Sequence, residues 1–238
     1  MGMMYGFIYE GTYKYEDFDK VGDTYTLKRN VPYFSSESNT QPGMPKYADL
    51  NGDGIIDDND RTMIGNGMPK HTGGFTNNFE YKGFDLSIFF QWSYGNDVLN
   101  ANRLFFENSN KTRDLNQYAS YADRWTPENP ESNIPRATDS GSNKVFSTRI
   151  IEDGSFLRLK TVSLGYTLPK QLTKKWKIDN ARVFVAGQNL WTCTGYSGYD
   201  PEVSIREGAL TPGLDFSAYP RAYSISFGIN LSLIHISE

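Results

Sequence analysis

The 238-residue sequence predicts an all-β fold, and three observations favour part of a transmembrane antiparallel β-barrel. Several segments alternate apolar and polar residues, the longer ones over about 10 residues, the length that a tilted membrane strand needs. Short and long connections follow one another, as in barrels with short periplasmic turns and long extracellular loops. Aromatic residues reach 15%, while no run approaches the roughly 18 apolar residues of a membrane helix. We therefore expect an open curved sheet with long loops.

The clearest alternation covers two segments, Phe84–Tyr94 and Tyr223–Asn230. Because successive strand residues point to opposite faces, each segment has one apolar face and one mostly polar face. Phe89 is the single apolar exception on the polar face of the first segment. In a barrel wall we expect these apolar side chains to face lipid: Leu86, Ile88, Phe90, Trp92, Tyr223, Ile225 and Phe227. We expect these polar side chains to face the lumen: Ser87, Gln91, Ser224 and Ser226.

Further strand candidates are Met3–Tyr13, Phe75–Tyr81, Phe156–Tyr166 and Ala181–Asn189. The dipeptide Lys82-Gly83 separates the second of these from the next strand, which predicts a tight hairpin because Gly accepts positive φ. The pattern of the third slips in phase between Leu159 and Val162. Residues at helical spacing in a long loop predict a short helix that ends before Pro127: Leu115, Tyr118, Ala119 and Ala122.

Charge and cysteine content exclude several classes of protein. The net charge is only -4, which gives no electrostatic reason to expect nucleic acid. The single cysteine, Cys193, excludes an intrachain disulfide and a cysteine-based metal site. The two histidines, His71 and His235, lie far apart without an obvious partner. No nucleophile elbow, zinc-protease motif or phosphate-binding loop is present, so we expect no enzyme activity.

The sharpest local motif is the acidic segment Asp49–Asp60 (DLNGDGIIDDND). Its spacing matches an EF-hand-type loop, in which a hard cation takes several oxygen ligands from a short segment. The expected metal ligands are the side chains of Asp49, Asn51, Asp53, Asp57 and Asp60 and the backbone carbonyl of Ile55. The last position is Asp where such loops carry Glu, and no helical pattern flanks the motif. We expect a structural ion, Ca²⁺ ahead of Mg²⁺; the alternative is a polar turn without an ion.

Aromatic residues near the strand ends invite two interpretations, sugar stacking and an interfacial girdle: Trp92, Tyr94, Trp191, Tyr196 and Tyr199. The girdle is favoured for Trp92 and Tyr94, because they end an apolar face. For Tyr196 and Tyr199, which lie in a loop, both interpretations stay open. No substrate-binding residue is assigned. The basic run Lys174–Lys177 is interpreted as a solvated turn on the periplasmic side.

Five segments resemble, in family order, the C-terminal part of the SusC/RagA family of TonB-dependent outer-membrane transporters: Tyr47–Asn66, Gly73–Asn96, Asp123–Arg136, Phe156–Pro169 and Val185–Val203. The resemblance implies a barrel of about 22 strands, of which residues 1–230 would supply the last six or seven. The plug and the TonB box of the family have no counterpart in the chain. Counting strands back from a periplasmic end then places the acidic segment outside the cell.

The resemblance also implies a function: import of large nutrients, glycans or peptides, without bond chemistry. A SusD-like lipoprotein would be the partner, the TonB–ExbB–ExbD complex the energy source, and the outer membrane of a Gram-negative bacterium the location. The alternative function, from another class, is an extracellular calcium-stabilised β-sandwich that binds carbohydrate. A sandwich packs its apolar side chains between two sheets, whereas a barrel turns them outward to lipid.

Both ends of the sequence are unusual. The start, Met1–Gly6, lacks the basic and apolar stretches of a signal peptide, which fits a fragment. Residues 231–238 (LSLIHISE) resemble one reading frame of a widely used transposon-end sequencing adapter. We expect this octapeptide to be a non-native tail, and His235 is therefore set aside as a functional candidate.

Overall fold

The computed structural model describes residues 2–108, 116–138, 145–205 and 211–233. The chain divides into two compact units, each assembled from three segments of the sequence. Unit 1 comprises Met1–Met68, Asp97–Asp153 and Glu202–Ala218, and unit 2 comprises Pro69–Asn96, Gly154–Pro201 and Tyr219–Glu238. Among the described residues, no helix has both the length and the apolar character needed to span a bilayer.

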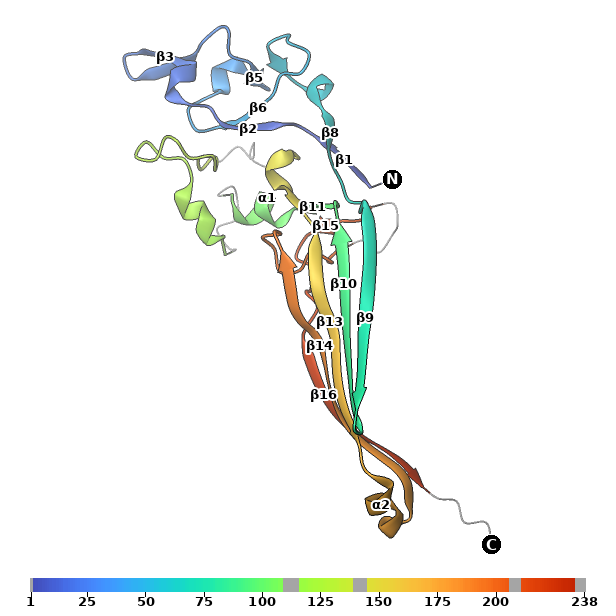
Figure 1. Cartoon of the computed structure of the whole chain (residues 1–238). Coiled ribbons are helices and arrows are strands. Elements are labelled where there is room, and N and C mark those ends of the chain that lie inside the picture. Colours follow the sequence, from blue (N-terminus) through green and yellow to red (C-terminus); the bar gives the residue numbers. More distant parts are fainter. Residues whose placement is uncertain (1, 109–115, 139–144, 206–210, 234–238) are drawn as a thin grey trace. The chain divides into compact units, whose positions relative to one another are not determined.

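Unit 2 is built on one five-stranded antiparallel sheet with the order β16-β14-β13-β10-β9 (Figure 1). Its strands are β9 (His71–Tyr81), β10 (Phe84–Tyr94), β13 (Phe156–Thr167), β14 (Ile178–Thr194) and β16 (Ser224–Leu233). A short helix α2 (Lys170–Thr173) and a 3₁₀ turn η6 (Lys174–Trp176) connect β13 to β14. The strands have 10 to 17 residues, enough to cross the apolar part of a membrane, which takes about 9–11 tilted residues.

Cross-strand pairing places most apolar residues of the five strands on one face. Phe90 on β10 pairs with Phe75 on β9 and with Leu159 on β13. Val185 on β14 pairs with Leu164 on β13 and with Phe227 on β16. Since directly paired residues share a face, this register confirms the predicted split. The apolar face carries Leu86, Ile88, Phe90, Trp92, Ile225 and Phe227, and the polar face carries Ser87, Gln91, Ser224 and Ser226. Tyr223 lies one residue before β16.

The hairpin between β9 and β10 is a two-residue turn, as predicted. Lys82 and Gly83 both have positive φ, 47° and 87°, which is the signature of a type I′ turn. The phase slip in β13 is a β-bulge. Phe89 pairs with Thr161 whereas the next residue, Phe90, pairs with Leu159, so that Lys160 is an extra residue in β13. The bulge lets the strand keep its apolar side chains on the same face along its whole length.

Unit 1 consists of short strands and single-turn helices. Its strands are β1 (Met3–Gly6), β2 (Tyr9–Thr12), β3 (Phe18–Val21), β4 (Thr24–Leu27), β5 (Tyr33–Phe34), β6 (Pro45–Tyr47), β7 (Ile55–Ile56), β8 (Thr62–Asn66), β11 (Asp97–Asn100), β12 (Ile151–Asp153) and β15 (Leu214–Asp215). Its helices are α1 (Asn102–Phe106) and the 3₁₀ turns η1 (Tyr15–Asp17), η2 (Glu37–Asn39), η3 (Asp58–Asp60), η4 (Ala119–Asp123) and η5 (Thr148–Ile150). Two small apolar clusters hold these pieces, one of Tyr13, Phe18 and Leu27 and one of Phe7, Tyr47 and Ile56.

The segment Met3–Tyr13 differs from the prediction of a barrel strand. It forms two short strands, β1 and β2, which pair with β8 and β6 inside unit 1. Phe7, between them, is buried against Tyr47 and Phe34, with ring centroids 5.5 and 5.6 Å away. The aromatic alternation of this segment therefore serves a local core. The long sheet contains five of the six strand candidates.

The predicted loop helix also differs in form. Ala119–Asp123 is a 3₁₀ turn, and Leu115 lies outside the described residues. At the other end, β16 continues past residue 230 into the segment expected to be a non-native tail, where Leu231 pairs with Ala181. Residues 234–238 lie outside the described part of the chain, and the non-native origin of the tail stays a prediction.

Candidate functional site

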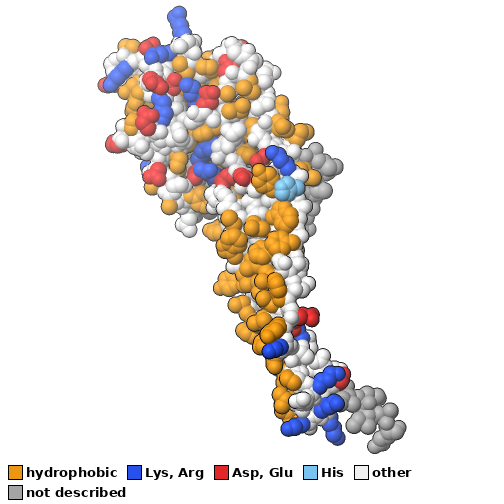
Figure 2. Space-filling view, viewed as in Figure 1, with side chains coloured by type: hydrophobic (Ala, Val, Ile, Leu, Met, Phe, Trp, Pro, Cys, Tyr) orange, Lys and Arg blue, Asp and Glu red, His pale blue; other side chains and the backbone are white. Residues whose placement is uncertain are grey.

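The apolar face of the long sheet is the first candidate surface. Phe79, Ile225 and Phe227 are 58%, 58% and 81% exposed, and Figure 2 shows hydrophobic side chains along the length of this sheet. Among the described residues, unit 2 has no second sheet that could bury them. The packed interior that a β-sandwich would need is therefore not formed in this unit. A contiguous exposed apolar surface of this extent marks contact with a partner or with lipid.

Aromatic residues gather at both ends of this apolar face. At the end with the β9–β10 turn, the rings of Phe84 and Tyr166 lie 4.5 Å apart between centroids. At the other end His71 stacks on Tyr94 at 5.1 Å, and the Trp92 Nε1–H donates to His71 Nδ1 at 3.1 Å. Two aromatic bands that flank an apolar stretch are typical of the girdles of membrane barrels. This placement favours the girdle interpretation of Trp92 and Tyr94.

The remaining predicted aromatic residues divide into two groups. Trp191 pairs with Leu159 and is half exposed on the apolar face, as a girdle residue would be. Tyr196 is only 5% exposed, which leaves no ring face open for a sugar. Tyr199 is 86% exposed, and its role in sugar stacking stays a prediction.

The polar face carries an ion pair that spans three strands. Arg182 on β14 reaches across β13 to Asp85 on β10, where its Nε–H donates to Oδ1 at 2.9 Å and its Nη2 donates to Oδ2. The pair passes over Gly165 of β13, at which any Cβ would collide with the Arg182 Nη2 and Asp85 Oδ1 atoms. A larger residue here would displace these two side-chain ends, so the glycine allows the two charged groups to lie directly over β13.

A second ion pair, between Arg158 on β13 and Asp200, is buried. The Nη2 of Arg158 donates to Oδ1 of Asp200 at 2.6 Å, and both side chains are only 3% exposed. The Nε–H of Arg158 also donates to Thr192 Oγ1 at 3.0 Å, and the other carboxylate oxygen of Asp200 accepts the backbone N–H of Arg221 at 3.0 Å. These bonds fasten the connection between β14 and β16 to the sheet.

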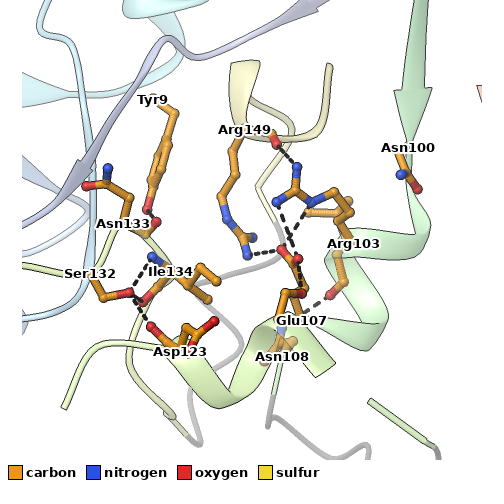
Figure 3. A network of polar contacts seen from close by, with 12 residues as sticks. Tyr9, Asn100, Arg103, Glu107, Asn108, Asp123, Ser132, Asn133, Ile134 and Arg149 are labelled. Carbon is orange, nitrogen blue, oxygen red and sulfur yellow. Dashed lines mark hydrogen bonds and ion pairs between the residues drawn. The ribbon is translucent and has the colours of Figure 1, made fainter. Parts of the chain in front are cut away.

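In unit 1, two guanidinium groups converge on one carboxylate (Figure 3). Glu107 accepts hydrogen bonds from Arg103 Nε at 3.1 Å and from Arg149 Nη2 at 2.7 Å. Its other oxygen accepts the Ser120 hydroxyl at 2.7 Å. The Glu107 side chain is 3% exposed, and the charge balance among these groups makes such burial possible. The network connects α1, η4 and η5, and its hydrogen bonds hold these three elements together.

Unit 1 also contains a pocket of about 500 Å³ beside the acidic segment. Its wall includes Phe7, Phe34 and Arg61, and the Arg61 guanidinium lies 5.2 Å above the Phe7 ring centroid. The volume is within the range of small-molecule sites. Sequence reasoning missed this pocket because its lining residues come from four separate segments, among them Tyr5 and Phe146, that share no motif.

In the acidic segment, the carboxylates bind the backbone of their own loop. Asp49 accepts the N–H groups of Gly52 at 2.7 Å and Gly54 at 2.8 Å. Asp60 accepts the N–H groups of Leu50, Asn51 and Asp57 at 2.8, 3.3 and 2.8 Å. Asp53 and Asp57 likewise accept the N–H groups of Ile55 and Asn59. Within the described ranges, no group of three or more Asp, Glu, His or Cys side chains is placed to hold a metal ion. The predicted ligands share one loop, but the side-chain oxygens of its aspartates accept hydrogen bonds from backbone N–H groups of the same loop.

Calcium binding by this loop stays a prediction, and limited proteolysis of the full-length receptor tests it. We expect Ca²⁺ to slow cleavage near Gly52, because an ion would recruit the carboxylates that now accept hydrogen bonds from backbone N–H groups of the loop. Asp53→Asn keeps an acceptor for the Ile55 N–H and removes one charge. We expect it to weaken the calcium protection and to leave cleavage without calcium unchanged. Equal cleavage of the wild-type protein with and without calcium would show that the acidic segment is a polar turn that binds no calcium.

Acid should loosen the same loop through Asp60. Burial favours the neutral carboxyl, but the backbone N–H groups of Asp57, Leu50 and Asn51 outweigh burial and lower the pKa of Asp60 below its usual value. A lowered folded-state pKa contributes stability above the unfolded value of about 3.9 and loses it as the pH falls through the folded value. We therefore expect cleavage in this loop to rise only below about pH 4, and Asp60→Asn to abolish that pH dependence.

A sheet with membrane-length strands, one exposed apolar face, one polar face and aromatic bands at both ends defines a class of protein. It is the wall of a transmembrane β-barrel. The polar face, with its cross-strand ion pair, corresponds to the lumen side of such a wall.

Comparison with known proteins narrows the class. No protein-family model matches the chain. It is 34% identical over 238 residues to TonB-dependent receptor P3 of Formosa agariphila, with 97% of this chain and 22% of the relative covered. It is 28% identical over 196 residues to TonB-dependent receptor SusC of Bacteroides thetaiotaomicron, with 82% of this chain and 18% of the relative covered. It superposes on a solved structure of the RagAB peptide transporter with a TM-score of 0.70 and 26% identity, over 96% of this chain and 22% of that one.

The chain belongs to the SusC/RagA-type TonB-dependent receptors. It spans about a fifth of the length of the curated relatives it matches. The fold expected from the sequence, part of an antiparallel β-barrel, is confirmed by these similarities. The similar proteins are receptors and transporters, and none of those described above is named as an enzyme.

Proposed function

We propose that this chain forms part of the barrel wall of a receptor that imports large nutrients across the outer membrane of a Gram-negative bacterium. The observation that carries the proposal is the continuous apolar face of the five-stranded sheet, opposite a polar face that holds the Asp85–Arg182 pair. Such a wall separates lipid from an aqueous or plugged lumen. The similarity to TonB-dependent receptors supports transport through that lumen with energy from TonB–ExbB–ExbD.

A glycan or a peptide is the proposed class of substrate. The similarity to SusC and to a peptide transporter, RagAB, supports large polar nutrients in general. Within the described part of the chain, the pocket lined by Phe7, Phe34 and Arg61 offers ring faces and a guanidinium group, which suit either substrate. A SusD-like lipoprotein is the proposed partner on the extracellular side, and its support is the two-component name of the RagAB transporter.

Deletion of the full-length gene in its host tests this function. We expect the deletion strain to lose growth on a glycan fraction or on a peptide fraction as the sole nutrient, and to grow normally on the corresponding monomers. A strain without TonB should show the same loss. Affinity purification of the tagged receptor from outer membranes should recover a lipoprotein in near-equal amount. Normal growth of the deletion strain on both polymer fractions, or recovery of the receptor outside the outer membrane, would contradict the proposal.

A further inference from the structure

The connection between β13 and β14 combines positive charge with exposed apolar side chains. Residues 168–179 contain Lys170, Lys174, Lys175 and Lys177, all exposed, and one acidic residue, the exposed Asp179. None of these four lysines forms an ion pair within the described ranges. Figure 2 shows Lys and Arg side chains around this end of the long sheet. Leu172 and Trp176 are 47% and 64% exposed, although a fully buried Thr173 anchors the turn against the sheet.

The β13–β14 connection begins beside the β9–β10 turn, at the same end of the sheet. The backbone N–H of Thr167, the last residue of β13, donates to the Gly83 carbonyl of that turn at 2.8 Å. Phe84 and Tyr166 form the aromatic band at the same end of the apolar face. The lysines and Trp176 therefore begin within a few residues of the point at which a barrel wall enters the headgroup layer. Trp and Lys side chains together are typical of that layer.

Both turns at this end place a lysine in a backbone conformation that disfavours it. Lys82 and Lys177 have φ values of 47° and 57°, in the left-handed region where Gly or Asn is preferred. The Lys82 ammonium lies 5.1 Å from the Tyr81 ring centroid, and the Lys177 N–H closes its turn by donating to the Lys174 carbonyl at 3.1 Å. Each of the two turns thus carries a lysine, which adds positive charge at this end of the wall.

We propose that the β13–β14 connection is a docking surface for anionic phospholipid headgroups of the periplasmic leaflet. The four lysines would contact headgroup phosphates, and Trp176 and Leu172 would enter the boundary between headgroups and acyl chains. Charge complementarity selects this occupant: four exposed lysines against one aspartate, Asp179, beside a lipid-facing surface attract anionic lipid over zwitterionic lipid. This inference rests on the proposed placement of the chain in a barrel wall. It replaces the interpretation of Lys174–Lys177 as a merely solvated turn.

Lipid titration of the full-length receptor in detergent tests the inference, with phosphatidylglycerol and phosphatidylcholine as probes. The test variant is Lys174→Gln/Lys175→Gln, and the matched control is Lys20→Gln/Arg29→Gln, which removes two exposed charges from unit 1. We expect the test variant to bind phosphatidylglycerol about 30-fold more weakly, because each lysine near an anionic surface contributes on the order of a fivefold preference. Binding of phosphatidylcholine should not change. The control variant and the conservative Lys174→Arg/Lys175→Arg variant should bind both lipids as the wild type does.

Three results would overturn the inference: unchanged phosphatidylglycerol affinity in the test variant, an equal loss in the control variant, or full competition by inorganic phosphate at the same concentration. Heat-modifiable gel mobility verifies that each variant is a folded barrel. Recovery of the receptor in outer membranes and nutrient-dependent growth are measured in parallel. If the receptor assembles and imports but shows no preference for phosphatidylglycerol, only the lipid inference fails. If it is absent from outer membranes, the proposed function fails first.

Discussion

The substitution Ile88→Arg should destabilise the barrel far more than the substitution Ser87→Arg at the neighbouring position. Ile88 lies in the middle of β10 on the apolar face, paired with Asn77 and Val162. Ser87 lies on the polar face between Asn78 and Ser163. A charged side chain at the lipid midplane costs about 2–4 kcal/mol, whereas a lumen substitution mainly changes polarity inside the barrel.

The comparison uses full-length Ile88→Arg and Ser87→Arg receptors refolded into lipid vesicles. We expect the urea midpoint of Ile88→Arg to fall in proportion to that cost, and the yield in outer membranes to fall with it. Ser87→Arg should fold close to the wild type. Because the two positions are adjacent in one strand and receive the same residue, the effect of strand position is nearly matched. Equal destabilisation by the two substitutions would contradict the assignment of the faces.

Removal of the Asp200 carboxylate should have a comparable effect by another mechanism. Arg158 and Asp200 are both 3% exposed, so that Asp200→Ala removes a buried carboxylate that the guanidinium contacts at 2.6 Å. Breaking a buried ion pair from one side costs about 3–5 kcal/mol. It also removes the acceptor of the Arg221 backbone N–H, which should release the connection between β14 and β16.

Thermal unfolding of the full-length receptor measures this effect. The control is Glu131→Gln, which breaks the surface pair with Lys14, where the glutamate side chain is 84% exposed. Exposed pairs contribute about 0–1 kcal/mol, so the control should unfold near the wild-type temperature. The double variant Asp200→Ala/Arg158→Met should recover part of the loss, because it removes the buried charge as well as its partner. A small effect of Asp200→Ala would show that water or another group compensates Arg158.

The sequence predicted the long sheet well because period-two alternation is imposed by the membrane on every strand. The alternation in Phe84–Tyr94 continues over the whole of β10. The Lys82-Gly83 turn was predictable because Gly accepts positive φ. Met3–Tyr13 shows the limit of this reasoning, since its aromatic residues pack into a local core of unit 1. Alternation reports that one face is apolar and does not report what covers it.

The candidate sites were less predictable because they depend on contacts between distant segments. The Arg182–Asp85 pair joins residues 97 positions apart, and Gly165 between them gives no sign of its role in the sequence. The acidic segment was recognised as a unit, but a ligand pattern specifies residue types and not the direction of their oxygens. In the structure those oxygens satisfy backbone N–H groups, which any polar turn must also do.

The bulge at Lys160 bears on how such walls are recognised from sequence. With Lys160 in regular register, Arg158 would turn toward lipid and Leu157 and Leu159 toward the lumen. The bulge accommodates the extra residue Lys160 locally. The alternation of apolar and polar residues therefore shifts by one position between the two halves of β13. A search that requires unbroken alternation would divide β13 into two pieces, each too short to cross a membrane. Topology methods that allow one skipped residue would recover the strand as a single span.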